Sequence, residues 1–527
     1  MRKISLSLLV IATLSCLSVK AQVVGSAIDV QHYAYALQVN DENDNIKGEA
    51  TIDIKFLKDA NTFHLDLVKP NAAGKGMLVS SVKEKGKDVH FVQDADVINI
   101  DAPAKANSLH SYVITYSGIP ADGLIISKNK FGQRTFFGDN WPNRAHNWLP
   151  CVDDPADKAS LEFTVTAPAH YQVIANGLKI KEEALPNNLR STHYKETALL
   201  APKIFVIGVA EFAIDNPGTP DGIPIYSYVF PENKERGFKD YAVAKDILPF
   251  YISKFGPYAY KKLANVQSKT RFGGLENASA IFYNETSVGS RGVEELMAHE
   301  IAHQWFGDAA SEKTFANLWL SEGFATYMTN YYLESKYGVD TLKKRLIKDR
   351  TTVLNFERRR MTPVVDTTVK GDYMALLNAN SYQKGGWVLH MMRRKLGDDV
   401  FWKGIRTYYA KYINGNANTD DLRKVMEQVS GQSLEIFFKQ WLLTAGHPQL
   451  AINWKYDADK KMVHLTIEQT QKDLFEMPVE LSINGQKHTV PVKAKSTTVE
   501  FAADAKPTSI VTDPDVNLLA SFTVTNN

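Results

Sequence analysis

Cysteine is almost absent from this sequence, with 2 Cys among 527 residues. That scarcity excludes a disulfide-rich scaffold and a zinc site built from cysteine alone. The sequence also has almost no excess of charge of either sign, because 61 Lys and Arg balance 59 Asp and Glu. The balance leaves no basic footprint for nucleic acid, and we expect no nucleic-acid partner. Beyond the N-terminus, no apolar run approaches the roughly 20 residues that a membrane-spanning helix needs.

The N-terminus has the pattern of a secretory signal peptide. Arg2 and Lys3 precede a short apolar run that ends at Leu17, and small residues follow it. We therefore expect residues 1–21 to be a signal peptide. The protein would then be exported, to the periplasm or out of the cell, with no transmembrane anchor after cleavage. An anchor helix and a lipoprotein modified at Cys16 are the less favoured alternatives.

The pattern of the chain changes twice. Residues 22–215 carry alternating and β-branched runs between turn residues, which predicts an N-terminal antiparallel β domain. Residues 216–446 are mainly helical in pattern, and residues 447–527 return to strands, as in a small C-terminal β-sandwich. The sequence therefore predicts a multidomain α+β protein. Helices are expected at about 235–256, 291–306, 321–337, 341–358, 384–396 and 420–444.

Two histidines in one predicted helix suggest a metal site. His299 and His303 lie four residues apart, so their imidazoles share one helix face and can converge on one ion. Catalytic zinc needs three protein ligands and one open position, and Glu322 is the candidate third ligand. Glu300 is placed to hold the metal-bound water. The plain alternative is a helix with two surface histidines and a salt-bridging glutamate.

This constellation resembles the M1 family of zinc aminopeptidases, the gluzincins that include aminopeptidase N and leukotriene A4 hydrolase. In that family His-Glu-x-x-His is followed by eighteen residues and a glutamate, which is here Glu322. The flanking segments 304–307 and 319–324 also look like the family. The resemblance implies a thermolysin-like, mainly helical catalytic domain over residues 216–446. It also implies one Zn2+ per chain on His299, His303 and Glu322.

A second motif lies upstream of the histidines. The pentapeptide Gly273, Gly274, Leu275, Glu276 and Asn277 resembles the family's exopeptidase motif, with leucine in place of the usual methionine. The resemblance implies that the glycines form an edge strand that pairs with the peptide backbone, while the glutamate binds the free α-amine. Physical chemistry agrees, because an edge strand can add an extended peptide and a carboxylate favours an ammonium over an acylated nitrogen.

Residues 381–386 look like the family's Tyr-x-Lys-Gly motif, which assigns Tyr382 to the oxyanion, and residues 148–158 look like the signature of its N-terminal β domain. Two departures stand out. Trp141 occupies the position where the family usually has Gln or Glu as a second amine contact, and Asp139 could substitute for it from a shifted loop. Residues 447–527 are also too few for the large C-terminal helical domain of many members.

The residues and the resemblance together predict a zinc-dependent aminopeptidase acting on peptides with a free N-terminus. Glu300 would be the general base, and Tyr382 would stabilise the oxyanion. Asp308, Thr326 and Lys384 could support the site, although each is more often an ordinary structural residue.

Three alternatives remain open. A thermolysin-type endopeptidase uses the same histidine motif, but Glu276 argues against it. A non-catalytic binding ectodomain would be expected to lose a ligand, the base or the tyrosine, and all five stand in this sequence. A bifunctional epoxide hydrolase could share the scaffold, although no residue in the sequence indicates that second activity.

Overall fold

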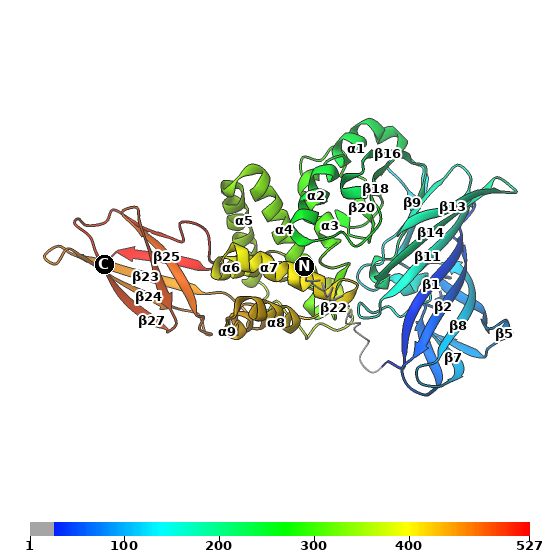
Figure 1. Cartoon of the computed structure of the whole chain (residues 1–527), viewed down its shortest axis with the longest axis horizontal. Helices are drawn as coiled ribbons and strands as arrows, with labels where there is room; N and C mark the ends of the chain where they lie inside the picture. Colours follow the sequence, from blue (N-terminus) through cyan, green and yellow to red (C-terminus); the bar gives the residue numbers. More distant parts are fainter. Residues whose placement is uncertain (1–25, 527) are drawn as a thin grey trace, which may run out of the picture.

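A computed structural model describes residues 26–526 of the chain. The molecule is elongated, with a β-rich N-terminal part at one end, a mainly helical part in the middle and a β-sandwich at the other end (Figure 1). This order agrees with the predicted fold class. The expected signal peptide at 1–21, and Cys16 within it, lie outside the described residues. Between residues 26 and 526, no helix combines the length and the apolar character needed to cross a membrane.

The N-terminal part consists of three sheets. Its strands are β1 (Ile28–Gln38), β2 (Ile46–Phe56), β3 (Ala60–Asp66), β4 (Gly76–Glu84), β5 (Lys87–Asp88), β6 (Phe91–Asp94), β7 (Val97–Ala104), β8 (Leu109–Ile119), β9 (Leu124–Lys128), β10 (Arg134–Gly138), β11 (Ala159–Pro168), β12 (Gln172–Ala175), β13 (Leu178–Leu185), β14 (Leu189–Leu200) and β15 (Ile207–Ala210). The largest sheet has the order β13-β14-β11-β1-β2-β8-β4-β5.

Buried and exposed residues alternate along the strands, and the buried ones form the core of this part. In β2, Ile52, Ile54 and Phe56 are fully buried, while the residues between them are partly exposed. This period of two places one face of the sheet in the core. The prediction of a purely antiparallel domain is wrong in one place, because β1 and β11 pair in parallel. The long connection between these two strands allows that arrangement.

The middle part combines a mixed sheet with helices. Its strands are β16 (Ala213–Gly218), β17 (Ile225–Val229), β18 (Leu263–Ser268), β19 (Gly274–Leu275), β20 (Ala280–Asn284), β21 (Ala310–Glu312) and β22 (Gly415–Ala417). Five of them form a sheet in the order β16-β17-β18-β20-β19, so β19 is an edge strand. The strand β16 crosses the predicted boundary at residue 216 and pairs with β17.

The helices of the middle part are α1 (Lys234–Tyr241), α2 (Ala244–Phe255), α3 (Val293–His303), α4 (Trp319–Tyr337), α5 (Val339–Glu357), α6 (Gly385–Leu396), α7 (Asp398–Tyr412), α8 (Thr419–Ser430) and α9 (Glu435–Phe438). Two π-helical turns, η7 (Asn380–Lys384) and η8 (Lys439–Leu443), lie directly before α6 and after α9. The helix expected at 235–256 is two helices, and the one expected at 420–444 is broken at Gly431, whose φ is 68°. The sequence prediction missed α7 entirely.

The C-terminal part is a sandwich of a four-stranded and a three-stranded sheet, ordered β27-β24-β23-β29 and β26-β25-β28. Its strands are β23 (Gln449–Asp457), β24 (Met462–Gln469), β25 (Met477–Ile483), β26 (Gln486–Val492), β27 (Ser496–Ala502), β28 (Ile510–Thr512) and β29 (Ser521–Asn526).

Buried polar contacts join the N-terminal part to the middle part close to the predicted metal site. Lys158 Nζ donates to the backbone oxygens of Asp308 and Ala309, at 2.8 and 3.0 Å. The ammonium of Lys203 forms an ion pair with Glu312, and both side chains are excluded from solvent. These contacts fix the end of the N-terminal β domain against the segment that follows α3.

Candidate metal centre and substrate cavity

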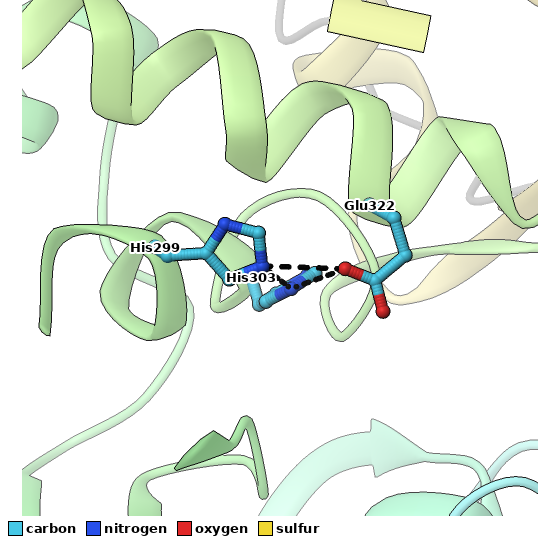
Figure 2. A group of neighbouring side chains, drawn as sticks. All are labelled: His299, His303 and Glu322. Carbon is cyan, nitrogen blue, oxygen red and sulfur yellow. Dashed lines mark hydrogen bonds and ion pairs between the residues drawn. The ribbon is translucent and has the colours of Figure 1, made fainter. Parts of the chain in front are cut away.

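The three predicted ligands converge on one point. Helix α3 carries His299 and His303 on one face, and the first turn of α4 carries Glu322. The side chains point toward one another in Figure 2. The Nε2 atoms of the two histidines are 3.1 Å apart, and Glu322 Oε2 lies 3.3 Å from His299 Nε2 and 3.2 Å from His303 Nε2.

This geometry fits a zinc ion. Ligand atoms about 2.0–2.1 Å from a tetrahedral zinc stand roughly 3.3 Å from one another, close to the separations found here. The other ring nitrogen of His303, Nδ1, lies 3.2 Å from the Phe306 carbonyl oxygen and 3.0 Å from Ser321 Oγ. A proton on Nδ1, donated to that carbonyl, leaves the Nε2 lone pair free for a metal.

The charge around the ligands also favours a cation. Burial alone would raise the pKa of Glu322, but the two imidazoles beside it lower that pKa strongly. For His303 burial acts in the opposite direction and lowers the pKa of the imidazole. Glu322 and the neighbouring carboxyls Glu276 and Glu300 outweigh burial and raise this pKa to about 10. Three buried carboxyls around two imidazoles therefore form an acidic pocket, which a divalent cation would neutralise.

One cavity of about 510 Å³ contains the metal site. Its lining includes the three ligands together with Glu276, Glu300 and Tyr382, which come from four different segments of the chain. Gly273 and Gly274 line the same cavity. The structure thus brings together the residues of all three sequence motifs around a single space.

Glu300 lies between the metal ligands and the edge strand. Its side chain is 5% exposed, and burial raises its pKa well above the usual value, which suits a group that must accept a proton. A Cβ atom on Gly274 would overlap the Glu300 carboxylate. Glycine at this position therefore lets the strand approach the predicted base.

The edge strand β19 places Glu276 beside the ligands. Within residues 26–526 it pairs only with β20, and Gly274 and Leu275 line the cavity. Gln304 fixes the chain after β19, because its Nε2 donates to the Glu276 carbonyl oxygen at 2.7 Å and to Asp308 Oδ2 at 2.8 Å. Glu276 Oε1 is buried and has no hydrogen-bond partner among residues 26–526, so it is available to a ligand.

Tyr382 lies in the π-helical turn η7. Its ring stacks on His299 with 6.0 Å between centroids and 10° between planes. Burial raises the pKa of the Tyr382 phenol well above its usual value, and Glu322 adds to that shift. The tyrosine is therefore a protonated hydrogen-bond donor next to the ligands, in a type of turn that often occurs at functional sites.

Two of the predicted substrate contacts, Asp139 and Asn277, do not line the cavity. Asp139 is fully buried, and its carboxylate is occupied by an ion pair with Arg144 and by hydrogen bonds from Thr270 Oγ1 and the Arg271 amide. Trp141, not Asp139, lines the cavity. Asn277 is buried behind the lining and begins the turn from β19 to β20, where its carbonyl accepts from the Ala280 amide at 3.0 Å.

The three supporting candidates differ in position. Thr326 lines the cavity. Asp308 is buried and reaches the site indirectly, through Gln304. Lys384 lies outside the lining and binds Glu357 instead.

Sequence reasoning missed several residues of the site. Ser321 and Gln304 each adjoin a ligand in the sequence and lie in the flanking segments that resemble the family, but neither was given a role. The cavity is also lined by Arg345, Lys348 and Asp349 of α5, for which the sequence offered no motif.

Comparison with known proteins assigns two domains of one family to the chain. Residues 240–441 match the peptidase family M1 domain, and residues 29–201 match the peptidase M1 N-terminal domain. The two matches together cover more than half of the chain and include the ligands, Glu300 and Tyr382. The chain belongs to peptidase family M1. The cluster of His299, His303 and Glu322 lies within the matched M1 domain.

Relatives of this M1 peptidase extend beyond the length of the chain. The chain is 26% identical over 508 residues to a probable aminopeptidase 2 of Sulfurisphaera tokodaii, and this match covers 92% of the chain and 63% of the relative. A leucyl aminopeptidase of Saccharolobus solfataricus is 24% identical over 506 residues, with 91% and 62% covered. Aminopeptidase M1-C of Oryza sativa subsp. japonica is 27% identical over 325 residues, with 59% and 37% covered. The chain thus spans less than two thirds of the length of each.

Proposed function

We propose that the protein is a zinc-dependent aminopeptidase that releases the N-terminal residue from peptides, and that its middle part is a thermolysin-like catalytic domain. The observation that carries the proposal is the position of Glu276. A buried carboxylate with an unpartnered oxygen shares one cavity with a three-ligand metal site, a predicted base and a phenol donor. The aminopeptidase names of the relatives support the same activity.

His299, His303 and Glu322 would hold the zinc ion. When bound, zinc would supply Lewis-acid chemistry, making a water molecule more acidic and a peptide carbonyl more electrophilic.

The side chains of the cavity supply the other steps. The Glu276 carboxylate binds the α-ammonium of the substrate and fixes the register, so that one residue is released at a time. Glu300 accepts a proton from the attacking water and passes it to the leaving amine. The Tyr382 hydroxyl donates a hydrogen bond to the oxyanion that forms from the carbonyl. The free edge of β19 binds the peptide backbone as an added strand.

Cleavage of two matched peptides tests this function. A short peptide and its N-acetylated form are incubated with the purified protein, and products are followed by mass spectrometry. An aminopeptidase shortens the free peptide one residue at a time and leaves the acetylated form intact. Internal cleavage of both peptides would identify an endopeptidase, and cleavage of neither would favour a binding protein.

Export remains a proposal from the sequence, based on the charged start and apolar run of residues 1–21. N-terminal sequencing of the protein made by its own host tests it. A mature chain that begins at residue 22 would support export, and a chain that retains residues 1–21 would contradict cleavage there.

A further inference from the structure

The turn that carries Tyr382 is fixed by two side chains on the N-terminal side of the tyrosine. Asn380 Nδ2 donates to the Thr362 carbonyl at 2.8 Å, and Ser381 Oγ donates to the Leu376 carbonyl at 2.7 Å. The middle of the turn, Tyr382 and Gln383, lines the cavity. The position of the phenol is therefore set by the residues that anchor the ends of η7.

Lys384 is the anchor at the C-terminal end of the turn. Its side chain is fully excluded from solvent, and its Nζ donates to Glu357 Oε1 at 2.8 Å and to the Gly446 carbonyl oxygen at 2.6 Å. A buried ammonium needs such partners, because burial without them would leave an uncompensated charge. Lys384 thus ties the tyrosine turn to the end of α5 and to the junction with the C-terminal β-sandwich.

Glu357 extends this connection. The Nδ1 atom of His447 pairs with its second oxygen, and the other ring nitrogen of His447 lies 3.3 Å from Ser521 Oγ in β29. Both Glu357 and His447 are buried. A continuous set of polar contacts therefore runs from η7 to a strand of the C-terminal sandwich.

The turn also lies directly against the helix of the third metal ligand. A Cβ atom on Gly323 would be 2.8 Å from the Gly385 Cα and 3.1 Å from the Ser381 carbonyl oxygen. The backbones of α4 and η7 meet here without side chains between them. A displacement of the turn would therefore move Tyr382 relative to Glu322 and the reacting carbonyl.

We propose that Lys384 is a positioning residue for Tyr382, held in place by Glu357 and by the Gly446 carbonyl, which lies just before the first strand of the C-terminal β-sandwich. The inference rests on the proposed aminopeptidase function and adds that the sandwich helps to hold the active-site tyrosine. Lys384 does not line the cavity that contains the three candidate ligands. It acts by fixing the turn from which the phenol reaches the oxyanion.

A double-mutant cycle tests this role. The kcat and KM for an aminoacyl fluorogenic amide are measured for the full chain and for Lys384→Met, Tyr382→Phe and the combined variant. Lys384→Met should lower kcat about 10- to 100-fold, because a displacement near 1 Å in a reacting group has effects of this order, and should change KM less than about 3-fold. In the Tyr382→Phe background the same substitution should change kcat less than about 2-fold.

A matched control separates positioning from stability. Arg350 of α5 also forms an ion pair with the C-terminal part, at Asp513, and among residues 26–526 it has no hydrogen bond or ion pair to η7. Arg350→Met should therefore weaken the same interface while leaving kcat within about 2-fold. If Lys384→Met alone unfolds, the double variant Lys384→Met with Glu357→Gln replaces it, because this variant removes both buried charges. Its kcat is then compared in the wild-type and Tyr382→Phe backgrounds.

The outcomes are distinct. An equal loss of kcat in both tyrosine backgrounds, an unchanged kcat in folded Lys384→Met, or an equal loss in Arg350→Met would overturn the inference. If both Lys384 variants unfold, His447→Gln is measured instead. A fall in kcat that occurs in the wild-type background but not in the Tyr382→Phe background supports the inference. An unchanged kcat in His447→Gln overturns it. An inactive wild-type protein would instead refute the proposed function.

Discussion

A single methyl group added at Gly274 should displace the predicted general base. The added Cβ would lie 2.5 Å from Glu300 Cγ and closer still to its carboxylate, whereas real contacts of this kind need at least 3.0 Å. The backbone of Gly274 does not have a positive φ, so alanine itself fits the strand. Glu300 must therefore withdraw by about 1 Å to restore ordinary contact distances.

A displacement of that size predicts a loss of about 10²-fold in kcat for Gly274→Ala, or about 2.7 kcal/mol in the activation barrier. The neighbouring glycine gives a matched control, because a Cβ on Gly273 meets only Leu296 Cδ1, at an ordinary 3.7 Å. Gly273→Ala should lose less than about 10-fold. The assay measures kcat and KM on an aminoacyl fluorogenic amide, with zinc content and thermal unfolding of each variant.

The reasoning would be refuted if Gly274→Ala kept kcat within about 3-fold of the wild type. It would also be refuted if both alanine variants lost kcat equally, since the two methyl groups would then act through something other than Glu300. Loss of zinc from Gly274→Ala alone would point to the ligands instead of the base.

Three further substitutions test other parts of the site. Glu300→Gln should keep zinc but lower kcat about 10²- to 10⁴-fold, and retained turnover would reject its role as base. Glu276→Gln should lower kcat/KM for free-amine substrates about 10- to 150-fold, the equivalent of about 1.5–3 kcal/mol for a hydrogen bond to a charged group, with metal content unchanged. Ser321→Ala removes a partner of His303 Nδ1 and should weaken zinc binding about 10- to 100-fold. Competition with a chelating dye measures the zinc affinity. An unaltered affinity would show that the Phe306 carbonyl alone orients the ring.

The convergence of the three candidate ligands was the most predictable feature of the molecule. His299 and His303 converge because residues four apart share a face of any α-helix, whatever surrounds it. Glu322 lies in the first turn of the next long helix, and the helical pattern around it was visible in the sequence. What the sequence alone could not supply was the packing of α4 against α3 that brings the carboxylate to the imidazoles.

The errors in the fold have physical causes. Helix α7 was missed although Phe401, Ile405 and Tyr408 bury one face, because aromatic and β-branched residues have low intrinsic helix propensity. Strand β18 is buried on both faces and shows no alternation, so its pattern did not distinguish it from a buried helix segment. The break at Gly431 follows from its left-handed backbone, which ends α8.

The errors in the site concern side-chain direction. Asp139 was a candidate because an acid near Trp141 could bind an amine, but Arg144 lies five residues away and takes its carboxylate. No sequence pattern shows which of two neighbouring side chains faces a cavity. The partners of Lys384 lie 27 and 62 residues away along the chain, so its role required the tertiary structure.

We propose that one zinc ion on His299, His303 and Glu322 is required for cleavage at a free N-terminus. Titration of metal-free protein with zinc tests it most directly, with cleavage of a free-amine peptide as the readout. The metal-free protein should be inactive, and activity should rise linearly to a break at one equivalent per chain. Full activity without metal, or a break at two equivalents, would contradict the account.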